Sequence, residues 1–308
     1  MTTAEAAFGG VWVRLDENTP VDEVAARVSS ASVLRLLRAG LVLAAALNLG
    51  VGLFLVLGSS LQYHASQAAS FARFRQELAA GTAPIRPTGA AGQPLPLGTP
   101  IALLEIPSLG LKVVVGEGTT AGVLADGPGH ERSTVFPGGA GTSVIMGRAA
   151  AFGGPFGRLG ELRPGARISV RTGVGEEQFS VVDVRRAPDV IPALASGAAR
   201  LTLVTASGPS FFPSGVIWVD ADATGPALAA SPPTMTMLPP DERPLGTSSG
   251  ALRWLLLGSV FLVVTLVGAR WTWRRMGRAH AWIVFSAPVA VLGYVMADQV
   301  ARLLPNLM

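Results

Sequence analysis

Three long apolar stretches limit what this chain can fold into. They fall at residues 36–58, 251–269 and 281–304, and the first contains 19 consecutive uncharged residues, 39–57. A helix needs about 20 such residues to cross the hydrocarbon core of a bilayer. A signal peptide is the alternative for the first stretch, but its apolar region is usually about 7–15 residues and lies near the start of the chain. We therefore predict three transmembrane helices.

The composition agrees with a membrane protein. Hydrophobic residues make up 49% of the chain and charged residues only 14%, whereas about 25% are charged in globular proteins. The chain has no cysteine, which excludes disulfides, thiolate metal sites and thiol nucleophiles. The net charge is +4, and Lys112 is the only lysine. Because the arginines flank the apolar stretches, membrane topology explains this charge better than nucleic-acid binding, and no cofactor is predicted.

The arginines also predict the orientation in the membrane. Arg35 and Arg38 precede the first stretch, and residues 270–280, between the second and third, contain four arginines and no acidic residue. Positively charged segments next to membrane spans stay in the cytoplasm. We therefore expect the N-terminal segment 1–32 and the loop 270–280 in the cytoplasm, and the region between the first two spans and the C-terminal end outside the cell membrane.

Between the first and second spans, the sequence predicts one compact domain. Residues 59–80 have apolar side chains at helical spacing and are expected to form a helix outside the membrane. Residues 81–98 and 223–250 are rich in proline and small residues, so we expect two extended linkers that pack poorly against their surroundings. The domain itself is expected at residues 99–222. At the N-terminal end, residues 20–23 are a plausible helix start.

The compact domain has the pattern of an all-β fold. Many short strand candidates are separated by turn residues, and few stretches have helical spacing. This pattern is typical of a closed β-barrel, here with about 7–8 strands. The strand candidates are residues 100–106, 111–116, 142–147, 166–171, 178–185, 200–206 and 215–220.

The strand candidate at residues 200–207 carries the strongest functional signal. It reads Arg-Leu-Thr-Leu-Val-Thr-Ala-Ser, in which apolar residues alternate with hydroxyls, and Gly208 and Pro209 end it. The pattern indicates a strand with one buried face and one face toward a groove. It resembles the strand that delivers the nucleophile in the sortases, the membrane-bound cysteine transpeptidases of Gram-positive cell envelopes. In that family the run reads Thr-Leu-x-Thr-Cys, and here Ala206 stands at the last position.

Other segments resemble sortases in the same order and spacing. The turn at residues 127–130 reads Gly-Pro-Gly-His, residues 137–145 resemble the approach to the catalytic histidine, and residues 154–165 resemble the segment beyond it. Residues 104–111, Leu-Glu-Ile-Pro-Ser-Leu-Gly-Leu, are similar to the family's entry strand. The resemblance covers roughly residues 100–220 and implies the sortase-type barrel.

The same resemblance implies that all three catalytic positions have changed. Sortases use a cysteine nucleophile, a histidine acid and an arginine that supports the oxyanion. The corresponding positions here are Ala206, Arg148 and Gly215. Arginine keeps its proton to above about pH 12 and cannot shuttle one near neutrality. The expected groove is lined by Thr205, Ala206, Ser207 and Arg148, with no catalytic residue.

Other polar residues offer weaker candidates. Ser207 or Thr205 is a possible substitute nucleophile with His130 as its base, because a serine nucleophile needs a base within hydrogen-bond reach. His130, however, matches a turn that is not catalytic in sortases. His64 and His280 lack metal-ligand spacing. Three scattered acidic residues are better explained as solvated loop acids than as a calcium site: Glu117, Asp220 and Asp222. No metal site is predicted.

These observations predict a pseudo-sortase, a membrane-anchored barrel without catalytic residues. Its expected role is to bind or scaffold a protein or peptide outside the membrane, in cell-envelope or surface-protein assembly. Two alternatives remain open. One is an active transpeptidase or hydrolase that uses Ser207, and the other is a docking subunit of a larger membrane complex. The oligomeric state is not predicted.

Overall fold

The structure is a computed structural model that describes residues 4–8, 11–15, 34, 38, 41–42, 45–89, 91–229, 231–247 and 250–308. The helix start predicted at residues 20–23 lies outside the described residues. The chain divides into two compact units, residues 1–52 and residues 53–308. In the first unit, β1 (Ala4–Phe8) pairs antiparallel with β2 (Val11–Leu15). The sequence did not predict this hairpin.

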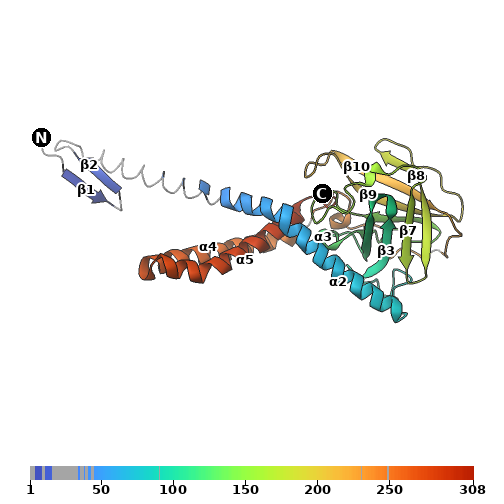
Figure 1. Ribbon diagram of the computed structural model, residues 1–308, viewed down its shortest axis with the longest axis horizontal. Helices are drawn as coiled ribbons and strands as arrows, with labels where there is room; N and C mark the ends of the chain where they lie inside the picture. The colour runs from blue at the N-terminus through green and yellow to red at the C-terminus, as the bar shows by residue number, and fades with distance from the viewer. Residues whose placement is uncertain are drawn as a thin grey trace. The chain divides into compact units, whose positions relative to one another are not determined.

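The second unit contains a closed β-barrel (Figure 1). Its strand order in the described part of the chain is β10-β8-β7-β3-β4-β5-β6-β9, so the all-β barrel prediction is confirmed. Most neighbours are antiparallel, but β4 pairs with β5 and β6 pairs with β9 in parallel. The strands are β3 (Pro100–Ile106), β4 (Leu111–Glu117), β5 (Gly129–His130), β6 (Gly141–Met146), β7 (Arg167–Thr172), β8 (Glu176–Arg186), β9 (Ala199–Ser207) and β10 (Gly215–Ala223).

The strand boundaries follow the apolar runs of the sequence to within about three residues, with the largest difference at the end of β10. Two short elements were not predicted. The strand β5 is only two residues long, and helix α3 (Ala121–Asp126) is a short helix that begins at Thr120. The Thr120 side chain caps this helix by accepting a hydrogen bond from the Val123 amide. Both elements are too short to show a periodic pattern.

A long helix packs on the outside of the barrel. A π-helical turn, η1 (Phe54–Gly58), leads into α2 (Ser59–Ala79). One face of α2 is buried, with Tyr63 and Phe74 at 6% and 1% exposure. Phe74 packs against Leu103 and Val114 of the barrel. The helix predicted at residues 59–80 is therefore present, and it covers the sheet rather than standing free.

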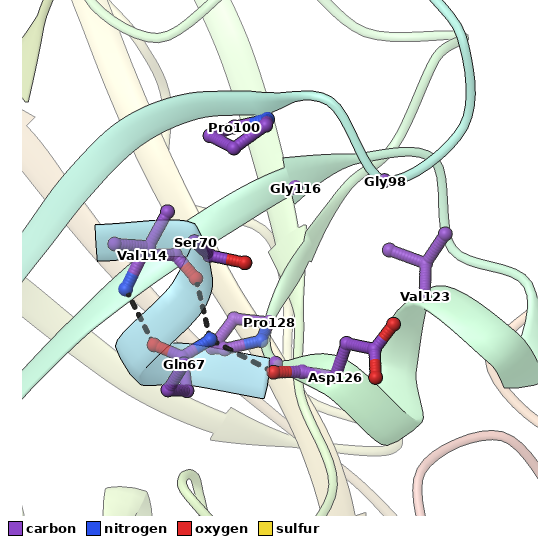
Figure 2. Close-up of a pocket in the computed structure, with 10 residues that line it drawn as sticks. Gln67, Ser70, Gly98, Pro100, Val114, Gly116, Val123, Asp126 and Pro128 are labelled. Carbon is purple, nitrogen blue, oxygen red and sulfur yellow. Dashed lines mark hydrogen bonds between the residues drawn. The ribbon is translucent and has the colours of Figure 1, made fainter. Parts of the chain in front are cut away.

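Gln67 fixes α2 to the barrel between these two aromatic residues. Its side-chain oxygen accepts from the Val114 amide at 2.8 Å, and its side-chain nitrogen donates to the Val114 carbonyl at 3.1 Å and to the Asp126 carbonyl at 2.9 Å (Figure 2). Strand β5 pairs with β4 only at Gly116 and Glu117. Val114 therefore has no β5 partner, and the amide of Gln67 satisfies its backbone groups.

We expect Gln67→Glu to loosen this part of β4. A carboxylate still accepts from the Val114 amide, but it cannot donate to the two carbonyl groups that Gln67 now satisfies. Amide hydrogen exchange across residues 111–117 should become about tenfold faster, equal to about 1.4 kcal/mol of local stability. Exchange in β10, on the other side of the barrel, is the internal control. Unchanged exchange in β4 would show that α2 is held by its apolar contacts alone.

Two further helices form an antiparallel hairpin, α4 (Gly250–Met276) and α5 (Arg278–Leu303) (Figure 1). Among the described residues, three helices are long and apolar enough to cross a membrane: these two and the helix Ala45–Ala79. The prediction of three such helices is confirmed. Small residues allow α4 and α5 to approach closely. A Cβ atom at Gly258 would lie 3.1 Å from Met296, and one at Gly268 would lie 3.1 Å from Phe285.

The arginine-rich segment 270–280 was expected to be a loop, but it is almost entirely helical. The turn is confined to Gly277, whose φ of +95° favours glycine. The arginines lie along the helices, with Arg275 over the ring of Trp271 and Arg278 over the ring of Trp273. Charged side chains end an apolar stretch without ending a helix, because their long stems extend along the helix surface.

The two expected linkers pack against the barrel at several points, so the expectation of poor packing was wrong there. Ala83, in residues 81–98, is buried beside Phe74. In residues 223–250, Glu242 is 1% exposed and pairs with Arg132. Its carbonyl accepts from the Thr119 hydroxyl at 2.6 Å. A proline-rich composition predicts extended backbone, but an extended backbone can still lie in contact with a domain.

Candidate functional site

The three positions that the resemblance assigned to the catalytic residues lie at neighbouring strand ends. Strand β9 lies between β6, its parallel partner, and β10, its antiparallel partner. Ala206 is near the end of β9, directly opposite Val216 of β10. Gly215 begins β10 and faces Ser207. Arg148 follows the end of β6, and the Gly147 amide donates to the Val204 carbonyl at 3.0 Å. The topology therefore brings together residues that the sequence separates by about sixty positions.

A hollow at these strand ends forms the candidate site. Ala206 and Ser207 line one part of it, and the loop that follows them lines another, with Ala149 and Met308 completing the wall. The presence of Met308 was not expected from the sequence. Thr205 does not face the hollow; its hydroxyl is buried and donates to the Gly147 carbonyl at 2.9 Å. Thr205 therefore joins the ends of β6 and β9 and is not free to act as a nucleophile.

Strand β9 has no open face. Eight of its nine residues, all except Ser207, are buried. Leu307, from the segment after α5, packs against Val204 and Ala206 in one apolar cluster with Leu124 and Met146. The sequence predicted a groove along one face of β9 and left open whether that groove is filled; in the structure, Leu307 from the same chain is buried in the cluster on that face.

Arg148 is fully buried and has no acidic partner in the described part of the chain. Its Nη1 donates to the Met308 carbonyl at 3.2 Å, and its Nη2 donates to the Ala121 carbonyl at 3.3 Å. Its guanidinium carbon lies 4.8 Å from the centre of the Phe152 ring. The remaining nitrogen, Nε, has no hydrogen-bond partner among the described residues.

The burial of Arg148 affects its protonation. Loss of hydration lowers the pKa of Arg148 to about 10, with a further lowering by the charge of Arg302 and an opposing effect of Asp298. The lowered pKa is still well above neutrality, so the side chain stays charged at neutral pH. Arg148 can hold a carbonyl group through hydrogen bonds, but it cannot act there as a proton donor and acceptor in turn.

His130 is occupied by structural contacts. Its Nδ1 lies 2.9 Å from Oε2 of Glu117, and its Nε2 lies 2.9 Å from the Val135 carbonyl. Both His130 and Glu117 are fully buried. Because a carbonyl only accepts, Nε2 carries the proton of that hydrogen bond. Neither ring nitrogen is available to a serine, so these contacts count against His130 as the base for Ser207.

The acidic residues considered for calcium are all paired. Asp220 binds Arg185 and accepts from the Thr202 hydroxyl, and Asp222 binds Arg200. No group of histidine, cysteine, aspartate or glutamate residues within the described ranges is arranged to hold a metal ion. The contacts of Asp220 and Asp222 join β8, β9 and β10, so these acids stabilise the sheet beside the site.

Sequence reasoning missed the residues after α5 that complete this site. Residues 305–308, Pro-Asn-Leu-Met, have no catalytic or binding pattern. They also follow a long apolar stretch, 281–304. Phe152, which stacks on Arg148, was missed as well. The only available signal was Pro305, which cannot continue a helix and therefore indicated that the chain changes direction there.

The fold is a closed barrel with a hollow at the ends of its strands, lined in part by Ala206 and Ser207. Residues 104–212 match the family model of the sortase domain. The barrel of this chain is therefore a sortase domain. A comparison with curated proteins finds no match.

Several solved sortase structures are similar to this chain. A Clostridium perfringens Sortase D5 transpeptidase has 20% identity and a TM-score of 0.43, covering 52% of this chain and 99% of that one. Sortase C-1 from Actinomyces oris has 24% identity and a TM-score of 0.36, covering 41% and 75%. Sortase E1 from Streptomyces coelicolor, determined with a tripeptide in its active site, has 21% identity and a TM-score of 0.37, covering 42% and 91%.

Proposed function

We propose that this protein is a pseudo-sortase: a membrane-anchored sortase domain that binds an extended peptide or protein segment without cleaving it. One observation carries the proposal. At the strand ends where a sortase would need a nucleophile and a proton-transferring group, this chain has Ala206 and a buried, charged Arg148. A methyl group cannot attack a carbonyl, and a guanidinium with a pKa of about 10 cannot shuttle protons at neutral pH.

The surroundings of the site support binding as the remaining role. The barrel closes around these positions, and the hydrogen bonds of Gly147 and Thr205 hold the two strand ends together. Backbone and guanidinium donors at such a place can bind carbonyl groups of an extended peptide. By analogy with sortases, the setting of this role is cell-envelope or surface-protein assembly at the outer face of the membrane.

Turnover of a sorting-signal peptide tests this proposal. The wild-type protein should neither cleave nor transfer the peptide, and Ser207→Ala should change nothing. The alternative, in which Ser207 is the nucleophile, requires turnover that Ser207→Ala abolishes. The third candidate, a docking subunit of a larger membrane complex, requires other membrane proteins that co-purify stably with the chain.

The orientation in the membrane is a separate prediction. The arginines of residues 270–280 favour a cytoplasmic turn, and the packing of residues 305–308 on the barrel supports an α5 that ends on the same side as the barrel. Because the chain lacks cysteine, single cysteines can be labelled without background. A cysteine at the exposed residue Ser210 should react with an impermeant thiol reagent in intact cells, and one at the exposed residue Ala279 only after the membrane is opened. Labelling at position 279 in intact cells would contradict this orientation.

A further inference from the structure

The segment that follows α5, residues 305–308, is buried in the sortase domain. Asn306 and Leu307 are fully buried, and Met308 is 5% exposed. Helix α5 ends at Leu303, and Leu304 and Pro305 turn the chain away from the helix. The segment therefore leaves the membrane hairpin and enters the barrel at the substituted active-site positions.

The domain and the segment before α4 bind the backbone of residues 305–308 from two sides. On one side, the Ala149 amide donates to the Leu307 carbonyl at 2.9 Å, and Arg148 donates to the Met308 carbonyl at 3.2 Å. On the other side, the Asn306 amide donates to the Gly246 carbonyl at 3.0 Å. Main-chain hydrogen bonds on both sides are how proteins commonly hold a bound peptide, since they do not depend on its side chains.

Two side chains add selectivity. Leu307 fills the apolar cluster that contains Ala206 and Val204. Asn306 donates to the Asp241 carbonyl at 2.7 Å and to the Arg243 carbonyl at 2.9 Å. This cluster includes an alanine where a sortase would have its cysteine, so Leu307 is buried in the same apolar cluster as the nucleophile position.

We propose that residues 305–308 are an intramolecular ligand of the pseudo-sortase groove, and that the groove accepts a partner peptide only when this segment leaves. The chemistry of the segment defines the ligand class. A partner must be extended, must offer carbonyl groups to Ala149 and Arg148, and must place a leucine-sized apolar side chain against Ala206. This inference rests on the proposed peptide-binding function. It assigns the class of ligand and the segment that controls access to the groove.

Because residues 305–308 are attached to α5, access to the groove should depend on the position of the membrane helices. Near the barrel, Tyr294 of α5 packs edge-to-face on Phe54, with ring centroids 5.1 Å apart, and Phe54 also contacts Phe152. Phe152 in turn stacks on Arg148. A displacement of α5 would therefore disturb two things at once: the segment that occupies the groove and the guanidinium that binds it.

Protection of a single cysteine tests the proposal in the full chain. In Ala206→Cys, Leu307 should shield the thiol from maleimide in detergent or nanodiscs. Removal of residues 305–308 should speed its labelling at least about tenfold, because burial of a leucine side chain is worth about one to two decades in an equilibrium constant. A cysteine at the exposed residue Ser196, which does not line the hollow, should label equally fast in both backgrounds. Equal labelling of Cys at position 206 with and without the segment would overturn the proposal.

Addition of a free peptide distinguishes a ligand from a merely structural segment. An acetylated peptide with the sequence of residues 304–308, Leu-Pro-Asn-Leu-Met, should restore protection in the shortened variant. The same peptide with aspartate in place of Leu307 should not. If neither peptide protects the thiol, the groove is not a peptide site and the proposal is wrong.

A milder variant covers the case in which the shortened chain does not fold. Leu307→Ala keeps the backbone hydrogen bonds of the segment and removes most of its apolar contact with Ala206. It should still speed labelling at position 206, and unchanged labelling would contradict the proposal. Its outcome is independent of the inactivity test, since turnover by the wild-type protein would overturn the pseudo-sortase function without any change in thiol protection.

Discussion

Three substitutions together are expected to give this protein the transpeptidase reaction that we propose it lacks. The triple variant Ala206→Cys, Arg148→His and Gly215→Arg should form a thioester slowly with a sorting-signal peptide, whereas Ala206→Cys alone should not. Loss of a nucleophile in a hydrolytic triad lowers turnover about a millionfold, and the remaining binding and oxyanion contacts leave only about 10³–10⁴ over water. Here all three positions differ, so the wild-type rate should be indistinguishable from background. Mass spectrometry of the trapped thioester measures how much of the triple variant has reacted.

The strand register decides where the arginine is best placed. Gly215 lies opposite Ser207, and a Cβ atom there would be 3.0 Å from the Ser207 hydroxyl. Val216 lies directly opposite Ala206 and therefore shares its face of the sheet. Val216→Arg should be compared with Gly215→Arg in the same background. The family spacing favours position 215, and the pairing favours position 216.

Two further comparisons make the reconstruction informative. The triple variant should react faster when Leu307→Ala is added, because the new cysteine then has less apolar cover. A triple variant that stays folded and still fails to form a thioester would show that the barrel has lost more than these side chains. Turnover by the unmodified protein would show instead that the substituted site is an active one.

The largest stability effect is expected at the buried pair Glu117 and His130. Glu117→Ala leaves the buried imidazole without a hydrogen-bond partner at Nδ1, and an unsatisfied buried polar group typically costs about 1–3 kcal/mol. The unfolding temperature should fall by about 2–12 °C, because 1 kcal/mol shifts a domain of about 150–250 residues by about 2–4 °C. Circular dichroism of the full chain in detergent measures this change.

Glu117→Gln is the matched control for the loss of stability in Glu117→Ala. The amide has the same shape and can donate to Nδ1 of His130, so the hydrogen bond is kept while the charge is removed. Its cost should be near the 1 kcal/mol of an ordinary buried hydrogen bond. If Glu117→Ala and Glu117→Gln lower the unfolding temperature equally, the hydrogen bond at Nδ1 contributes little and the pair matters only through its packing.

The sequence predicted the elements whose pattern is local. Strands such as β3 and β9 have apolar runs bounded by glycine and proline, and α4 and α5 are long apolar stretches, so both kinds of element could be found by inspection. The arginine-rich turn was placed correctly but made too long, because the helices continue through it to Gly277. A charged side chain changes the polarity of a helix surface without changing its backbone preference.

The candidate site was predicted only in part, since its parts lie far apart along the chain. The positions of Ala206 and Arg148 followed from resemblance to a family. The contact of Leu307 with Ala206 joins residues about a hundred positions apart and involves no polar motif. Likewise, no motif marked Gln67 in the sequence. Its role depends on a stretch of β4 that has no β5 partner, which only the sheet pairing reveals.

During synthesis, the barrel is made well before residues 305–308. The last barrel strand, β10, ends at Ala223, so 81 residues, 224–304, separate it from the segment. At a synthesis rate of about 5–20 residues per second, the segment is made about 4–16 s later. Barrels rich in non-local pairings fold in about milliseconds to seconds. If residues 305–308 are the intramolecular ligand that we propose, each newly made molecule passes through a brief period with its groove unoccupied, and a peptide present at that moment meets no intramolecular competitor.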